Sequence, residues 1–284
     1  MTQKKKPLLL MAMDLDGTLL DSAKRVPPSA VQAMAEAVRR GRQTVFATGR
    51  GKAEIGEYLS LLPFVRYGIL ESGAVVYDFL AGHALEVFPL PAEKVEACLD
   101  TCGLEDAMPQ FLTVEESVVT PGQLARMEEY HHGCFREMFE QVCTRTSDMR
   151  GYAAAHPDGI VKICMYHRSM ESRTRSKDRL QEYDMALKYS GETSLEATEV
   201  NVTKGEALRR LCERLRIPLS QCAACGDGEN DLELFAAAGF SIAMGNAPGA
   251  VRRAADAVVS GNDDGGQTEA LLLAFPPGES SEET

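Results

Sequence analysis

Short β-prone runs alternate with amphipathic helical segments at both ends of this 284-residue chain. Such runs, bounded by turn residues, predict strands, and apolar residues recurring every three or four positions predict helices. Strands that alternate with helices form a parallel sheet covered on both faces. The sequence therefore predicts an α/β fold with a Rossmann-like, doubly wound parallel sheet. Ligands of such sheets bind at the carboxyl ends of the strands.

The spacing of these elements predicts a second domain. The predicted strands are residues 8–13, 44–47, 67–70, 221–225, 240–243 and 257–259, and the predicted helices are 29–40, 52–61, 205–215, 231–238 and 268–274. After the turn at Ser72, roughly 110 residues remain unassigned, which is the size of a small domain. Within this insert we predict helices over 95–102 and 123–142 and strands over 111–119 and 160–166.

Two aspartates, Asp14 and Asp16, directly follow the first apolar run. Unpaired carboxylates at the end of a buried strand are costly, so a bound cation and a chemical role are the economical explanation. One aspartate can attack an electrophile while the other transfers a proton. The alternative is a glycine-containing turn with solvated aspartates.

A second acidic group follows the weakly apolar run 222–225. Asp227, Asn230 and Asp231 are spaced so that they share one face if a helix begins here. The start of a helix carries partial positive charge that favours anions. The pair Cys222 and Cys225 in this run is interpreted as core packing, because a zinc site would need a second, correctly spaced ligand pair.

Two further segments suit a bound phosphate. Thr48 and Gly49 follow the second strand, where a hydroxyl and exposed backbone N–H groups can hold phosphate oxygens, although Thr48 alone could be a helix N-cap. Lys204 precedes an amphipathic helix and could offset the charge of three aspartates and hold an anion.

Together these segments resemble the haloacid dehalogenase-like superfamily, and specifically its Cof-type phosphatases with a type IIB cap. The motifs that carry the resemblance are Asp14-Leu-Asp16-Gly17-Thr18, Thr48, Lys204-Gly205 and Gly226-Asp227-Gly-Glu-Asn230-Asp231, with further similarity at 243–248 and 262–265. The resemblance implies a discontinuous core, residues 1–81 and 191–275, and an inserted α+β cap of C2B type, residues 82–190. The polar segment 276–284 is predicted to be a disordered tail.

The resemblance also implies Mg²⁺-dependent hydrolysis of a small phosphate ester. Asp14 would attack phosphorus, and Asp16 would protonate the leaving oxygen and then activate water. The implied metal ligands are the Asp14 carboxylate, the Asp16 carbonyl and Asp227, with Asp231 orienting water or Lys204. The implied phosphate-binding residues are Thr48, Gly49, Lys204 and Asn230.

One turn departs from the family pattern. Ser72-Gly73-Ala74 stands where family members often have Asn-Gly-Ala, and Glu71 precedes it. We expect Glu71 and Ser72 to influence which substrate hydroxyls are accepted. The substrate itself is not predicted, and sugar phosphates, flavin mononucleotide and pyridoxal phosphate all fit.

Composition excludes some classes of partner. The net charge of −12 argues against nucleic acid, and no apolar run approaches the roughly 20 residues of a membrane span. Eight cysteines without an export signal suggest a cytoplasmic protein with reduced thiols. The sequence does not predict an oligomeric state. Two alternatives remain at this stage: a sugar phosphomutase similar to phosphomannomutase, and a non-catalytic sugar-phosphate-binding regulator.

Overall fold

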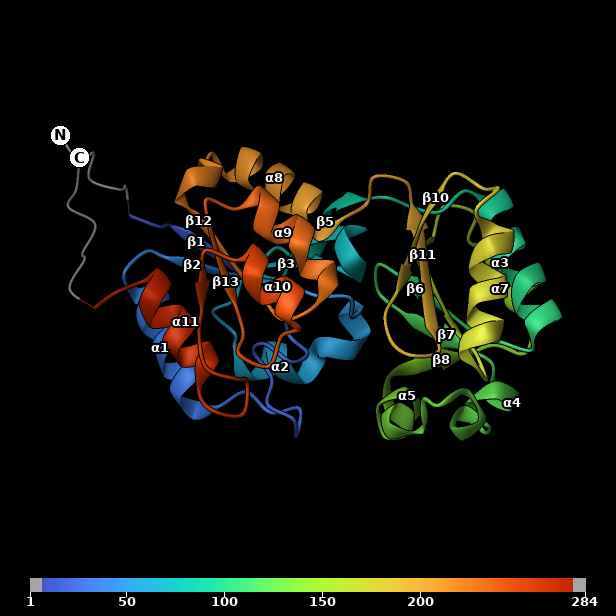
Figure 1. Ribbon diagram of the computed structural model, residues 1–284. Helices are drawn as coiled ribbons and strands as arrows, with labels where there is room; N and C mark the ends of the chain where they lie inside the picture. Colours follow the sequence, from blue (N-terminus) through green and yellow to red (C-terminus); the bar gives the residue numbers. More distant parts are fainter. Residues whose placement is uncertain (1–6, 278–284) are drawn as a thin grey trace. The chain divides into compact units, whose positions relative to one another are not determined.

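The computed structural model describes residues 7–277, which form two compact units (Figure 1). Within the described residues, unit 1 contains 7–49, 57–85 and 203–277, and unit 2 contains 50–56 and 86–202. The cap limits expected from the sequence, 82 and 190, stay a prediction. Of the predicted disordered tail, 276–284, all but the first two residues lie outside the described part of the chain, and its disorder stays a prediction.

Unit 1 is built on an eight-stranded sheet with the order β14-β13-β12-β1-β2-β3-β4-β5. The strands from β14 to β3 are parallel, and β4 pairs antiparallel with β3. Their bounds are β1 Leu10–Met13, β2 Gln43–Ala47, β3 Tyr67–Leu70, β4 Val75–Asp78, β5 His83–Val87, β12 Cys222–Gly226, β13 Phe240–Ala243 and β14 Ala257–Val258. The helices are α1 Pro28–Arg39, α2 Gly56–Leu61, α8 Lys204–Leu215, α9 Leu232–Ala237, α10 Gly249–Ala254 and α11 Gly266–Ala274.

Strand β1 lies at the centre of this sheet, between β12 and β2. All four of its residues are completely buried, which is typical of a parallel strand covered on both faces. Helices α8 and α9 lie over one face, and α1 and α11 lie over the other (Figure 1). The predicted doubly wound parallel sheet is confirmed, and the antiparallel addition of β4 was not predicted.

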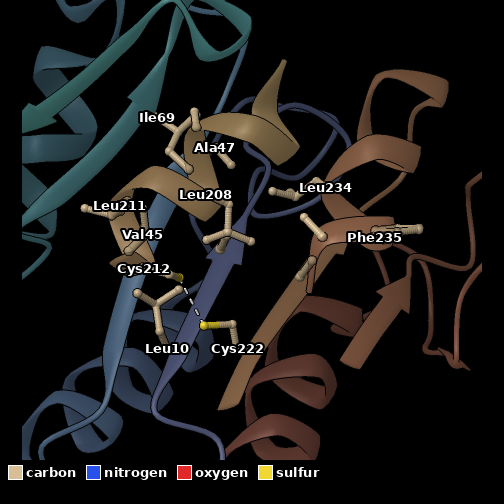
Figure 2. Close-up of a cluster of buried hydrophobic side chains, with 14 of the residues drawn as sticks. Leu10, Val45, Ala47, Ile69, Leu208, Leu211, Cys212, Cys222, Leu234 and Phe235 are labelled. Carbon is tan, nitrogen blue, oxygen red and sulfur yellow. Dashed lines mark hydrogen bonds between the residues drawn. The ribbon is translucent and has the colours of Figure 1, made fainter. Parts of the chain in front are cut away.

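The core beneath α8 and α9 contains one cysteine of the 222–225 run, Cys222. Cys222 lies with Leu10 and Leu208 in this cluster, and its sulfur is 3.2 Å from the sulfur of Cys212 on α8 (Figure 2). Cys225 is also completely buried, and its sulfur lies 3.6 Å from that of Met244. The two thiols have different partners, so the prediction of core packing is confirmed.

Unit 2 is a six-stranded sheet with the order β10-β11-β9-β6-β7-β8. It is antiparallel except between β7 and β8. Its strands are β6 Met108–Thr113, β7 Ser117–Val119, β8 Cys143–Arg145, β9 Ile160–Tyr166, β10 Met185–Tyr189 and β11 Ser194–Glu199. Its helices are α3 Ala92–Glu105, α4 Pro121–Leu124, α5 Arg136–Val142, α6 Met149–Ala155 and α7 Met170–Leu180.

Two elements predicted for the insert differ from the structure. The single strand predicted over 111–119 is a hairpin, because the Thr113 hydroxyl accepts hydrogen bonds from the N–H groups of Glu115 and Glu116 and closes a turn. The helix predicted over 123–142 is broken into short helices, and His131 ends one of them in the left-handed region with φ 55°. Within residues 7–277, no helix combines the length and apolar character needed to cross a bilayer.

Candidate active site

A buried cluster of charge lies at the carboxyl end of β1. The Lys204 ammonium is 2.7 Å from Oδ1 of Asp14 and 2.7 Å from Oδ1 of Asp231. None of the three side chains is more than 8% exposed. Asp14 directly follows β1, Lys204 is the first residue of α8, and Asp231 lies in the turn after β12. The parallel sheet therefore brings together three residues that are far apart in the sequence.

Asp231 uses both of its carboxylate oxygens within unit 1. Oδ1 accepts from Lys204, while Oδ2 accepts from the backbone N–H groups of Asp227 and Gly228 at 3.1 and 3.0 Å. These bonds satisfy N–H groups in the turn that precedes α9. Asp231 thus fixes the position of Lys204 and shapes the loop that carries Asp227.

Asp227 lies against the loop that follows β1. The Thr18 hydroxyl donates to Oδ1 of Asp227 at 3.1 Å. Gly17 has φ 78°, and a Cβ atom there would lie 2.4 Å from Oδ2 of Asp227. Glycine is required at this position both for the left-handed backbone and for the close approach of the carboxylate.

Three carboxylates are close enough to share a cation. One oxygen from each of Asp14, Asp227 and Asp231 lies within 4.8 Å of the others. Burial raises the pKa of Asp14 to about 8, with Lys204 opposing and Asp231 adding to the rise. Burial, followed by the charge of Asp231, raises the pKa of Asp227 to about 6. The carboxylates repel one another here, and hard oxygen donors of this kind suit Mg²⁺.

Asp16 is oriented differently from Asp14. Its carboxylate accepts a hydrogen bond from the Lys24 ammonium at 2.7 Å, and both side chains are partly exposed. Lys24 has φ 60°, in a turn where its N–H group donates to the carbonyl of Asp21. Asp16 is therefore the more accessible of the two aspartates, and its pairing with Lys24 was not predicted.

The predicted phosphate-binding residues come from three loops of unit 1. Thr48 is 1% exposed and follows β2, the parallel neighbour of β1, so Thr48 and Gly49 lie at the same edge of the sheet as Asp14. Asn230 is exposed in the turn between Asp227 and Asp231. Lys204, the remaining predicted phosphate ligand, contacts the buried carboxylates of Asp14 and Asp231.

Glu71 and Ser72 lie in a strained turn after β3. Both are buried, with φ values of 45° and 61°, and non-glycine residues in this region are uncommon. The N–H group of Ser72 donates to the carbonyl of Thr48 at 3.0 Å. A Cβ atom on Gly73 would lie 2.3 Å from the carbonyl of Thr203, so this turn packs tightly against the start of α8.

Sequence reasoning missed three residues that touch the site. Thr18 and Lys24 contact Asp227 and Asp16, as described above. The side-chain amide of Asn246, which follows β13, donates to the carbonyl of Gly17 and to Oδ2 of Asp227. Thr18 and Asn246 both lie in segments that carried the family resemblance, but a threonine and an asparagine do not by themselves indicate a role in the site.

Comparison with known proteins identifies the family. The family model for haloacid dehalogenase-like hydrolases matches residues 11–271. The chain belongs to this family. The match spans both acidic loops, Thr48 and Lys204, and it confirms the resemblance found in the sequence.

Individual relatives agree with this assignment. The chain is 27% identical to phosphatase YwpJ of Bacillus subtilis over an alignment of 278 residues, and this alignment covers 90% of this chain and 96% of that protein. It is 26% identical over 260 residues to the pyridoxal phosphate phosphatase YbhA of Escherichia coli, covering 89% and 93% of the two chains. A solved haloacid dehalogenase-like hydrolase from B. subtilis superposes with a TM-score of 0.82 at 26% identity, over 92% of this chain and 98% of that one. The protein is thus a phosphoric monoester hydrolase of the haloacid dehalogenase-like superfamily.

Proposed function

We propose that this hydrolase is a Mg²⁺-dependent phosphatase of small phosphorylated metabolites that works through an aspartyl-phosphate on Asp14. The observation that carries the proposal is the buried contact of Lys204 with Asp14 and Asp231, beside Asp227, at the carboxyl ends of parallel strands. A buried carboxylate next to a lysine and two further carboxylates has no evident structural purpose, because apolar residues would pack there at lower cost.

Asp14 is the nucleophile in this proposal. One of its carboxylate oxygens attacks phosphorus, the bond from phosphorus to the ester oxygen breaks, and the alcohol leaves. Lys204 contacts Asp14 through Oδ1 and fixes the orientation of the carboxylate. Thr48, Gly49, Lys204 and Asn230 are the groups proposed to hold the non-bridging phosphate oxygens as their charge shifts.

Asp16 is the proton carrier. It gives a proton to the departing ester oxygen and then takes one from the water that attacks phosphorus in the aspartyl-phosphate. Inorganic phosphate is released and the Asp14 carboxylate is restored, so one ester and one water give one alcohol and one phosphate. The partial exposure of Asp16 suits this role, because the water that attacks the aspartyl-phosphate must reach its carboxylate.

The carboxylates Asp14 and Asp227, with the Asp16 carbonyl, are the proposed Mg²⁺ ligands. When bound, the cation would offset the repulsion between an anionic carboxylate and an anionic phosphate. The raised pKa values of Asp14 and Asp227 support this assignment, because burial disfavours their ionised forms and a bound cation would stabilise them. Asp231 holds Lys204 in place rather than acting on the substrate.

The substrate class is inferred from similarity and from the insert. One relative is a pyridoxal phosphate phosphatase, which is consistent with a small phosphorylated metabolite here too. Residues 82–190 are the proposed cap that chooses among such metabolites, with Glu71 and Ser72 as further candidates. All eight cysteines are free thiols, which supports the proposal of a cytoplasmic protein.

Phosphate release from a panel of phosphorylated metabolites, with Mg²⁺ and with EDTA, tests the proposal. We expect steady release with Mg²⁺ and almost none with EDTA. The variant Asp14→Asn should lose several orders of magnitude in rate, whereas Asp158→Asn, the same change at an exposed turn position, should not. Full activity in EDTA would refute the metal requirement. Interconversion of hexose 1- and 6-phosphates, dependent on a bisphosphate primer and without phosphate release, would favour the mutase instead.

A further inference from the structure

The side-chain amide of Asn246 joins two loops that carry proposed site residues. Its nitrogen donates to the carbonyl of Gly17 at 2.9 Å and to Oδ2 of Asp227 at 3.2 Å. An amide nitrogen carries two hydrogens, so it can satisfy one acceptor with each. Asn246 follows β13, whereas Gly17 follows β1 and Asp227 follows β12. One side chain therefore connects the ends of three strands.

The two acceptors that Asn246 satisfies are themselves very close together. The clash that a Cβ atom at Gly17 would make with Asp227 shows that the two loops are almost in contact. A carbonyl oxygen and a carboxylate repel each other unless a donor lies between them. Thr18 already holds Oδ1 of Asp227, so Asn246 and Thr18 together fix both oxygens of this carboxylate.

Asn246 is held in turn by its own neighbours. Its Oδ1 atom accepts a hydrogen bond from the N–H group of Asn262 at 3.0 Å. Asn262 is buried, and its side-chain amide donates to the carbonyl of Leu20 at 3.0 Å, in the segment that follows the first acidic motif. The amide of Asn246 is thus oriented by a network that returns to the loop it contacts.

We propose that Asn246 is a positioning residue that sets the Asp227 carboxylate for metal binding. The inference rests on the proposed function, because it assumes that Asp227 is a Mg²⁺ ligand. Asn246 is exposed, so its loss removes little packing and the variant should fold. Partners that orient a metal ligand by hydrogen bonding change metal affinity by roughly 10- to 100-fold when they are removed.

Mg²⁺ binding measured by titration calorimetry tests the inference without relying on turnover. Asn246→Leu keeps a similar volume but removes both donated hydrogen bonds, and we expect its Kd for Mg²⁺ to rise about 10-fold or more. The matched control is Gln221→Leu. The Gln221 amide donates to the carbonyl of Pro7 at 2.9 Å, so it makes the same kind of bond at the opposite end of β1 and β12. The control should bind Mg²⁺ as the wild type does.

Four results separate the possible outcomes. Unchanged Mg²⁺ affinity in Asn246→Leu would overturn the role of Asn246, and so would an equal loss in Gln221→Leu, which would indicate general loosening of the sheet. If the wild type itself binds no Mg²⁺, the proposed function fails, and the role of Asn246 fails with it. Saturating Mg²⁺ should restore most of kcat in Asn246→Leu, which a general structural defect would not allow. Asn246→Ala replaces the leucine variant if that variant does not fold.

Discussion

Replacing Asp14, the proposed nucleophile, should stabilise the metal-free protein. Asp14 is buried, and burial raises its pKa from the ordinary 3.8 to about 8, with Lys204 opposing the rise and Asp231 adding to it. An acid with a raised pKa costs stability when it is ionised. The cost is absent below pH 3.8, grows as the pH rises and is complete above about pH 8. The amide introduced by Asp14→Asn would mimic the neutral acid and avoid this cost, and Lys204 would keep its bond to Asp231.

The size of the effect follows from the two pKa values. The gap between the unfolded pKa of 3.8 and the folded pKa of about 8 limits the gain in unfolding free energy of Asp14→Asn to about 6 kcal/mol at pH 8. Relaxation of the site and coupling among the carboxylates reduce this limit, and we expect Asp14→Asn to gain about 2–4 kcal/mol at pH 8. At pH 5 the gain should be below about 1.5 kcal/mol, because this pH lies only about one unit above the pKa of 3.8 that Asp14 has in the unfolded chain.

Urea unfolding in EDTA at pH 5 and pH 8 measures these differences, with Asp158→Asn as the control for loss of one exposed charge. Saturating Mg²⁺ should shrink or reverse the gain, because the wild type then has a cation to bind and the variant lacks one ligand. An Asp14→Asn protein that is less stable than the wild type at pH 8 in EDTA would refute the electrostatic reasoning, as would a gain that does not depend on pH.

Four further predictions test other parts of the site. Gly17→Ala should weaken Mg²⁺ binding and activity, because its Cβ would collide with Asp227. Gly41→Ala, at a residue with a similar φ of 73° and open space around it, should lose stability only. Equal activity in the two variants would contradict this prediction. Asp16→Asn should accumulate the aspartyl-phosphate after a burst with an activated ester, and a normal rate of dephosphorylation would remove Asp16 from its role. Lys204→Met should cost about 3–5 kcal/mol in unfolding free energy and abolish nearly all activity. Its control is Lys94→Met, which breaks the ion pair with Glu199 in unit 2. The control should lose stability, but each folded molecule should still release phosphate from p-nitrophenyl phosphate. Mg²⁺ affinity should rise from pH 6 to pH 8 with release of protons, because Asp14 and Asp227, with pKa values of about 8 and 6, must be deprotonated to bind the cation. A Mg²⁺ affinity that does not change over this range would show that these carboxylates are not the ligands.

The sequence predicted unit 1 well because its strands are continuous apolar runs. Leu10–Met13 is buried at every position and Phe240–Ala243 at every position but the first, so their hydrophobic pattern marks them clearly. The acidic motifs were visible for a related reason, since Asp14 and Asp231 are polar residues that follow such runs. Parallel pairing then places them at one edge of the sheet without any knowledge of side-chain contacts.

The insert was harder to predict because local turn chemistry decides its elements. Thr113 closes a hairpin and His131 adopts a left-handed backbone, and neither conformation can be predicted from the residue type alone. Strands such as Met185–Tyr189 are half-exposed and were not recognised. The roles of Asn246 and Lys24 depend on which distant group each one reaches, and a single sequence does not contain that information.

Chemical trapping of the phosphorylated residue tests the central claim most directly. Asp16→Asn would be mixed with an activated phosphate ester and Mg²⁺, reduced with borohydride, digested and analysed by mass spectrometry. An aspartyl-phosphate at position 14 should be reduced there to homoserine, and the signal should be absent when the ester is omitted or when Asp14→Asn is added to the variant. Efficient phosphate release by the wild type combined with no reduction at position 14 in Asp16→Asn, or with reduction at another carboxylate such as Asp227, would contradict the account.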